Sequence, residues 1–283
     1  MLAAVLTRLG RLRVTLIYAV ALAAVAMAMV EFGPRFQEKV VRYASTNVHN
    51  LEQGRIGTLI GSAFVNEAGP IYLWLPGLVA LLALGELLWE SHRLVIAFVV
   101  GHVGATLIVA AGLAAAIASG ALSRSAAYAA DVGMSYGAVA VLGTITAAIP
   151  LRWRAAWAGW WLAVAISSTA LSGGEFTNAG HTVALILGMV VGSRFARSVS
   201  WTITRYLLLV VGAGFGYLIL AYSDLSTHRV AMFGVAGAVI AWALGRLVLG
   251  RLVQTNSSAE ASIQSDSQLS GGLSSNSPGI SHS

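Results

Sequence analysis

Residues 94–123 read LVIAFVVGHVGATLIVAAGLAAAIASGALS, a stretch without a single Asp, Glu, Lys or Arg. The hydrocarbon core of a bilayer is about 30 Å thick, and about 20 consecutive apolar residues cross it as a helix. A run of this length therefore predicts a membrane-spanning helix rather than a segment of a water-soluble core.

The composition of the whole chain agrees with a membrane protein. Of its 283 residues, 57% are apolar and 10% are charged, and the mean hydropathy is +0.78. A soluble domain carries about 25% charged residues, so an ordinary water-soluble enzyme is excluded. The absence of cysteine excludes disulfides, a thiol nucleophile and thiolate metal sites. The net charge of +6 comes from basic residues at the ends of apolar runs, which is typical of membrane orientation rather than of a nucleic-acid interface.

Eight charge-poor runs follow one another along the chain, the second interrupted only by Glu86. Backbone polar groups must be satisfied inside lipid, so these runs predict an all-α, polytopic transmembrane helical bundle. The runs cover residues 14–30, 68–89, 94–123, 132–151, 155–174, 176–193, 206–223 and 230–245.

The distribution of arginine predicts the orientation of the bundle. Most arginines lie on the cytoplasmic side if the N-terminus is cytoplasmic, and an even number of spans returns the C-terminus to that side. Run 14–30 exceeds the 7–15 residues usual for the apolar part of a signal peptide, which favours an uncleaved anchor. Residues 33–67 form the largest external loop, in which the apolar segment 56–65 is expected to lie in the interface or dip partly into it. We expect a multi-pass protein of the cell (plasma) membrane.

One serine and one histidine are predicted to meet at the same depth. Ser135 and His181 lie roughly 6 and 9 Å below the external surface on helices that enter from outside. A serine hydroxyl needs an adjacent base to become a nucleophile, and histidine is the natural base near neutral pH. The alternative interpretation is a hydrogen bond that only packs two helices together.

Small residues surround both side chains, which favours close approach of the two helices. Gly133 and Gly137 flank the serine, and a stripe on one helical face follows the histidine: Ala184, Gly188 and Gly192.

These residues resemble the rhomboid intramembrane serine proteases. Gly133-Met134-Ser135 is similar to the start of the GxSG motif of that family, and His181 with Gly188 and Gly192 is similar to its HxxGxxxGxxxG helix. Segments 62–65 and 85–86 extend the resemblance over residues 10–195. It implies a six-helix core with Ser135 as nucleophile, its backbone N–H as an oxyanion donor, and His181 as general base. It also implies that the site opens to the external side and cleaves within or near transmembrane segments of other membrane proteins.

The chain departs from the family pattern where the oxyanion is held. Rhomboid proteases usually carry a His and an Asn in the second core helix, whereas residues 70–76 contain neither. Position 136 is Tyr136 instead of Gly, and the external loop offers Arg55 without a preceding Trp. Tyr72 and Asn178 are the candidate substitute donors.

The resemblance divides the chain into three parts. Residues 1–195 are expected to form the rhomboid-like transmembrane core, and residues 196–253 two additional transmembrane helices. Residues 254–283 are Ser-rich and free of aromatic residues, so we expect a disordered cytoplasmic tail.

Two other functions remain open at this point. The chain can be a catalytically inactive rhomboid-like protein that binds transmembrane helices, or, less well supported, a small transporter built around Glu86 and His102. We expect His102 to be a packing residue bonded to a carbonyl or to Thr106, and Glu86 to reach Arg93 or water. No metal, cofactor or nucleic acid is expected; the expected partners are transmembrane segments and the lipid bilayer.

Overall fold

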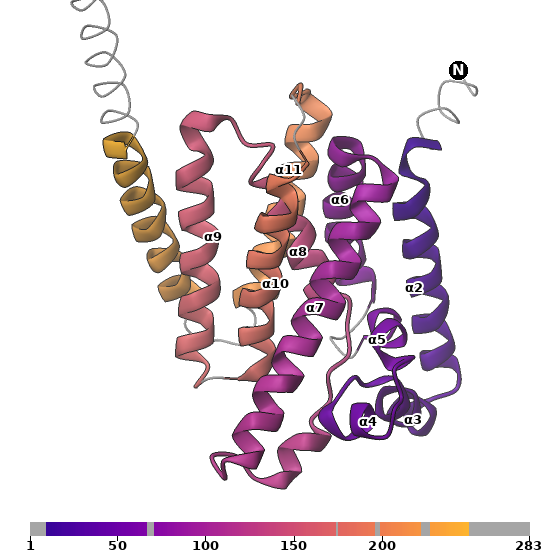
Figure 1. Cartoon of the computed structure of the whole chain (residues 1–283). Helices are drawn as coiled ribbons and strands as arrows, with labels where there is room; N and C mark the ends of the chain where they lie inside the picture. The colour runs from indigo at the N-terminus through magenta and orange to yellow at the C-terminus, as the bar shows by residue number, and fades with distance from the viewer. Residues whose placement is uncertain (1–9, 67–70, 174, 196–198, 222–226, 249–283) are drawn as a thin grey trace, which may run out of the picture.

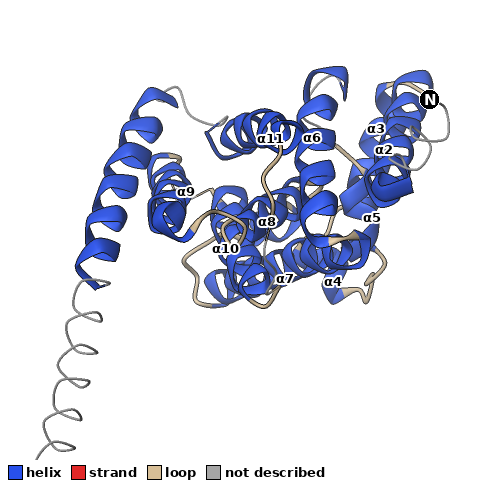
Figure 2. Cartoon of the chain, turned by 90° about the horizontal axis from the view of Figure 1, so that it is seen from above, coloured by secondary structure: helices blue, strands red, loops and turns tan. Residues whose placement is uncertain are grey.

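The computed structural model of the chain describes residues 10–66, 71–173, 175–195, 199–221 and 227–248. Within these ranges every regular element is a helix and no strand occurs (Figures 1 and 2). The elements are η1 (Gly10–Leu12), α2 (Arg13–Glu31), α3 (Pro34–Ala44), α4 (Val48–Glu52), α5 (Thr58–Gly61), η2 (Ser62–Phe64), α6 (Ile71–Trp89), α7 (Ser91–Ala118), η3 (Arg124–Tyr128), α8 (Ser135–Ile145), α9 (Leu151–Leu171), α10 (Phe176–Ser193), α11 (Ile203–Ala221) and a last helix, Thr227–Val248. The predicted all-α polytopic bundle is confirmed.

Six helices of the described part are long and apolar enough to cross a membrane. They are Gly10–Glu31, Ile71–Trp89, Ser91–Ala118, Phe176–Ser193, Ile203–Ala221 and Thr227–Val248. Helix α9 carries Arg152 and Arg154 in its first turn and does not meet the same measure, although at 21 residues it is about 31 Å long.

The predicted span 132–151 is wrong in its length. The helix in this region, α8, has 11 residues and is about 16 Å long, too short to cross the hydrocarbon alone. Residues 129–134 precede it as non-helical chain, Gly133 has a positive φ of 128°, and the helix stops ahead of Pro150. Every residue from 136 to 145 is buried, so α8 is the central helix of the bundle.

Helix α8 is surrounded by α6, α7, α10 and α11 (Figure 2). Its closest neighbour is α10, where Gly188 lies against the backbone of Ala140 and Gly192 lies against Thr144. A Cβ at Gly188 would collide with the Ala140 carbonyl, so the small residue is what allows the two backbones to approach.

Helix α11 packs against the bundle with one face. Gly212 lies against Leu81 of α6, and Gly216 lies against Leu142 of α8. The hydroxyl of Ser168 on α9 donates to a carbonyl of α11. The last helix, Thr227–Val248, lies outside α9, where Gly237 faces the α9 backbone (Figure 1). The predicted tail, residues 254–283, lies outside the described residues.

The loop of residues 33–67, predicted to be external, folds over its described part into short helices that enter the bundle. Helices α3, α4 and α5 and the turn η2 gather beside α2 and α7 (Figure 1). Ser62 and Ala63 are buried, whereas Ile56 and Ile60 are exposed. Ser62 contacts His102, which is about 16 Å along α7 from its first residue, so the segment does dip to this depth.

Candidate functional site

The first residue of α8 is Ser135, and the external loop holds it in place. The backbone N–H of Asp131 donates to Ser45 Oγ at 2.8 Å, and the carbonyl of Asp131 accepts from the Thr46 N–H at 3.0 Å. The N–H of Gly133 donates to the Ser62 carbonyl at 2.9 Å. Because three bonds tie residues 131–133 to the loop, the position of the serine depends on both segments.

The amino-terminal turn of α8 presents free backbone donors. The first backbone bond of the helix runs from the Ala138 N–H to the Met134 carbonyl at 2.9 Å. In the described part of the chain, the N–H groups of residues 135–137 have no backbone acceptor, as expected at a helix start. Such donors, aligned with the helix dipole, can hold an anion or an oxyanion.

The imidazole of His181 is buried on α10 without a hydrogen bond. It is 5% exposed, and neither ring nitrogen has a hydrogen-bond partner among the residues that the structure describes. Its ring meets the Tyr136 ring edge to face at a centroid distance of 5.2 Å. His181 therefore contacts Tyr136, the residue that follows Ser135, and no hydrogen bond joins His181 to Ser135.

Tyr136 fills the space between α8 and α10. Its side chain is 2% exposed and lies over Gly180, where a Cβ would collide with the phenol ring. Its hydroxyl lies near Asp131 and Thr177 without reaching a partner at hydrogen-bonding geometry. The residue that departs from the family motif is thus the one that contacts the histidine.

The two candidate substitute donors lie in different environments. Asn178 is 4% exposed, one turn before His181 on α10. Tyr72 is 72% exposed near the start of α6, so it does not line the buried cluster. The structure thus offers Asn178, and not Tyr72, to a reaction near α8.

The predicted packing residues divide between two neighbours of α8. Gly188 and Gly192 of α10 lie against α8, and Ala184 is fully buried on the same helix. Gly137 of α8 instead faces the ring of Phe98 on α7. Close approach of α7 and α10 on both sides leaves α8 no solvent-facing surface beyond its first residue.

Unsatisfied buried polar atoms gather around the start of α8. They are Asn66 Nδ2, His102 Nδ1, Tyr136 Oη and both ring nitrogens of His181. The Asn66 amide oxygen lies next to Gly133, and the His102 and Tyr136 rings are 6.4 Å apart. Proteins rarely leave buried polar atoms without partners, so this cluster is suited to receive water or polar groups of a ligand.

Asp131 adds a titratable group at the edge of this cluster. Burial raises the pKa of its carboxyl group to about 6, against a smaller opposite effect of the Tyr136 hydroxyl. The carboxyl group therefore changes its charge near neutral pH.

A second serine–histidine pair lies deeper in the bundle, and sequence reasoning did not predict it. Ser62 Oγ is 3.0 Å from His102 Nε2, and the Thr46 hydroxyl is 2.9 Å from Ser62 Oγ and 2.8 Å from the Thr58 carbonyl. The expectation that His102 bonds to a carbonyl or to Thr106 is therefore wrong. The two residues are 40 positions apart, and only the inward dip of the external loop brings them together.

The Thr58 carbonyl, at the end of this chain of hydrogen bonds, determines which group donates in each bond. The Thr58 carbonyl can only accept, so Thr46 uses its single proton there and accepts from Ser62. Ser62 then accepts the Nε2–H of His102, whose Nδ1 has no partner in the described residues. Because the proton of Ser62 points away from the imidazole, this pair is arranged as a structural tie and not as a nucleophile with its base.

Glu86 caps the start of α2, and the hydrogen bonds of its carboxylate come from Val14, Thr15 and Ser91 rather than from Arg93. Its carboxylate accepts the backbone N–H groups of Val14 and Thr15 at 3.0 and 2.9 Å. It also accepts the hydroxyls of Thr15 and Ser91, both at 2.7 Å. Four donors on one carboxylate satisfy the start of α2, which has no capping side chain of its own. Across the described residues, no group of three or more His, Cys, Asp or Glu side chains is placed to hold a metal ion.

Comparison with known proteins gives one match. The family described as rhomboid-like protein matches residues 10–199. No curated protein and no solved structure matches the chain. The match spans α2 to α10 and therefore includes both serine–histidine pairs.

Proposed function

Because the chain belongs to the rhomboid-like family, we propose that it is an intramembrane serine endopeptidase in which Ser135 is the nucleophile and His181 the general base. The observation that carries the proposal is the state of His181. A buried imidazole with two unpartnered nitrogens is costly in a purely structural role, because packing histidines are normally hydrogen-bonded. This ring contacts Tyr136, which directly follows Ser135 in the sequence.

The reaction follows from the groups at the start of α8. Ser135 Oγ attacks a substrate carbonyl as His181 takes its proton, and the negative oxygen receives hydrogen bonds from the free N–H groups of the helix start. The imidazolium returns the proton to the leaving amine. Water then attacks the acyl-enzyme with His181 again as base, releasing the second product and free Ser135.

The substrates in this proposal are transmembrane segments of other membrane proteins. The bundle presents apolar helices to the bilayer, so a substrate that approaches laterally is itself a membrane helix. We place the protein in the cell (plasma) membrane with both termini cytoplasmic, and the start of α8 open to the external side. Water reaches Ser135 there because that side chain, unlike the rest of α8, is not buried.

The test is labelling of the purified full-length protein by a serine-reactive fluorophosphonate. We expect the wild-type protein to be labelled and Ser135→Ala to lose the label. Ser62→Ala is the matched control, because that serine also lies beside a histidine but directs its proton elsewhere. Labelling that survives Ser135→Ala, or that disappears only in Ser62→Ala, rejects the proposed nucleophile.

A second candidate is a catalytically inactive member that binds transmembrane helices. The missing hydrogen bond between Ser135 and His181 favours it. Catalytic hydrogen bonds are, however, often long or poorly aligned until substrate binds, so the protease remains our preferred function. A membrane partner that co-purifies equally with the wild-type protein and Ser135→Ala, in the absence of labelling, supports the inactive binder.

A further inference from the structure

Two hollows lie one above the other at the end of the bundle where α2, α7 and α11 begin. The first, the cup, has a volume of about 590 Å³ and opens at the surface of the bundle. Its charged side chains come from η1, α2, the end of α6, the start of α7, and α11. They are Arg11, Arg13, Glu86, Glu90, His92 and Arg205.

The hydrogen bonds of the cup arginines are with neutral groups. Arg13 donates to the Ser91 hydroxyl at 3.2 Å, and Arg205 donates to the Leu87 carbonyl at 2.7 Å and to Ser200. Within the described ranges these hydrogen bonds end on hydroxyl and carbonyl oxygens rather than on carboxylates. The carboxylate of Glu86 is already saturated by its four donors. Three guanidinium groups therefore face the cup with donors left over for an anion.

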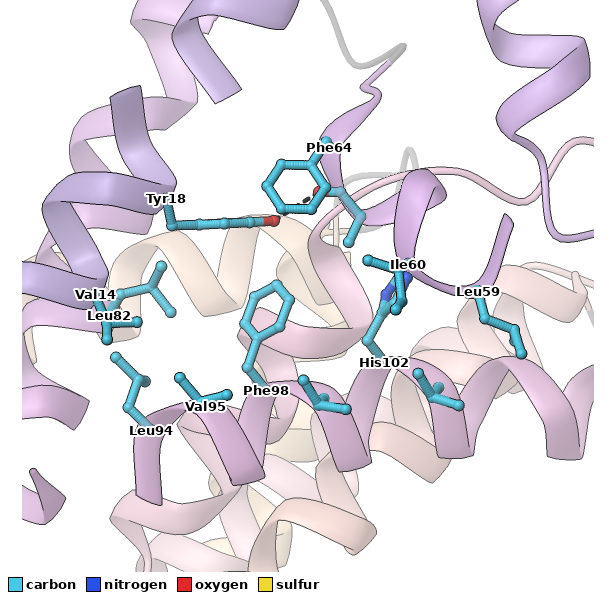
Figure 3. A pocket seen from close by; sticks show the side chains of 13 residues that line it. Val14, Tyr18, Leu59, Ile60, Phe64, Leu82, Leu94, Val95, Phe98 and His102 are labelled. Carbon is cyan, nitrogen blue, oxygen red and sulfur yellow. Dashed lines mark hydrogen bonds between the residues drawn. The ribbon is translucent and has the colours of Figure 1, made fainter. Parts of the chain in front are cut away.

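The second hollow, the crevice, is apolar and has a volume of about 240 Å³ (Figure 3). It lies between α2, α6, α7 and the segment of α5 and η2, and its walls include Tyr18, Phe64 and Phe98. On α7 it extends from Leu94 to Val103, a distance of about 14 Å. This length is close to one leaflet, since half of the hydrocarbon core is about 15 Å.

The cup and the crevice share three helices, so a single ligand can occupy both. On α2 the consecutive residues Arg13 and Val14 belong to the cup and the crevice in turn. On α6, Glu86 lines the cup and Leu82, one turn away, lines the crevice. On α7, His92 lines the cup and Leu94 lines the crevice. The polar hollow is at the bilayer surface and the apolar one extends inward, which is the order of a lipid headgroup and its chain.

We propose that the cup and the crevice together bind one phospholipid with an anionic headgroup. The phosphate lies among the arginines, which bind phosphate oxygens through paired N–H donors, and an acyl chain lies in the crevice. A phospholipid is favoured over a partner helix, because the arginines of the cup favour an anionic group directly beside the apolar crevice. The lipid belongs to the leaflet at the arginine end of the bundle, which the charge distribution predicts to be cytoplasmic.

The headgroup is tested by native mass spectrometry of the full chain in detergent. Phosphatidylglycerol is compared with phosphatidylcholine of the same acyl chains, and Arg13→Gln with Arg152→Gln. Arg152 is the matched control, because it is exposed at the start of α9, away from the cup. We expect phosphatidylglycerol to bind more tightly than phosphatidylcholine and Arg13→Gln to weaken it by about tenfold, with Arg152→Gln unchanged.

The acyl chain is tested separately by filling the crevice. Val99 is 47% exposed in the crevice and Val190 is 53% exposed on α10 outside it, so Val99→Trp and Val190→Trp are a matched pair. We expect only Val99→Trp to lose the lipid, with both variants monodisperse and equally resistant to heating.

Inorganic phosphate distinguishes a lipid from a free anion. If phosphate alone displaces the lipid and Val99→Trp still binds it, the cup holds only the anionic group and no acyl chain enters the crevice, so the proposal is overturned. Equal retention of both lipids by Arg13→Gln and the wild-type protein overturns it as well. These outcomes do not depend on Ser135, so they leave the proposed protease untouched.

Discussion

The molecule contains two serine–histidine pairs that differ in where their protons are held. In the deeper pair, Ser62 and His102 are 3.0 Å apart, and the chain of bonds ends at a carbonyl that takes the last proton. In the outer pair, Ser135 and His181 are not bonded, and both nitrogens of the imidazole are free. A short serine–histidine distance is therefore not by itself the mark of a catalytic pair. The direction in which the surrounding groups hold the protons decides what the pair can do.

The largest difference between the pairs is expected in reaction rate. Replacement of the general base, His181→Gln, should slow fluorophosphonate labelling by about 10²-fold or more, because the serine loses its proton acceptor. His102→Gln should leave the rate close to that of the wild-type protein. Both rates are measured on equal amounts of folded protein. If labelling slowed only in His102→Gln, the deeper pair would be the catalytic one and the outer pair the structural one.

The outer pair also depends on the close contact of α8 with α10. Gly188→Ala places a methyl group against the Ala140 carbonyl. It should lower the free energy of unfolding by about 3 kcal/mol, the upper end of the usual cost of overpacking. Gly214→Ala on α11 is the control, since nothing lies within 4 Å of the added atom. Thermal unfolding in detergent measures both. Equal stability of the two variants would contradict the packing described for α8.

The deeper pair is expected to matter more for stability than the outer one. Ser62→Ala leaves the His102 N–H without its acceptor and the Thr46 hydroxyl with only its bond to the Thr58 carbonyl, and should cost about 1–2 kcal/mol. Ser135→Ala breaks no side-chain hydrogen bond among the described residues and should change stability by no more than about 0.5 kcal/mol. Chemical or thermal unfolding of the two variants, side by side, gives the comparison. The reverse order would mean that the outer serine is the structural one.

The smallest expected effect concerns pH at the edge of the outer pair. The half-buried carboxyl of Asp131 has a pKa raised to about 6 by partial burial, so its neutral form is favoured in the folded protein. This contribution is complete below about pH 4, near the ordinary value for Asp, and is lost as the pH rises through 6. Tm should therefore fall by roughly a few degrees between pH 4 and 7 through this group, and Asp131→Asn should remove that part. Glu52→Gln, an exposed carboxyl in the external loop, serves as the control.

Whether a predicted helix has the correct length depends on what surrounds it. Run 176–193 predicts the helix Phe176–Ser193, because a charge-free stretch of membrane length has few other conformations in lipid. The run over 132–151 misleads, because an apolar segment enclosed on all sides by other helices needs no lipid-spanning length. The two runs have the same apolar character in the sequence, and they differ only in the helices that surround them in the structure.

The candidate site was partly visible in the sequence. Helical depth arithmetic indicates that Ser135 and His181 lie at similar levels, and the small residues after the histidine indicate a close neighbour. The contact of Tyr136 with His181 and the tie between Ser62 and His102 had no such signal. Each depends on a side-chain direction or on the path of a loop across many positions of the chain.

The amino-acid sequence by itself determined the helical class, the membrane environment and the family, because hydropathy and motif spacing are properties of consecutive residues. The tertiary structure alone decided that Ser62 bonds to His102 and that Tyr136 contacts His181, how short α8 is, and where a charged cup meets an apolar crevice. The physical reason is that burial in lipid is specified along one chain segment, whereas hydrogen bonds and cavities arise between segments that only the packed bundle brings together.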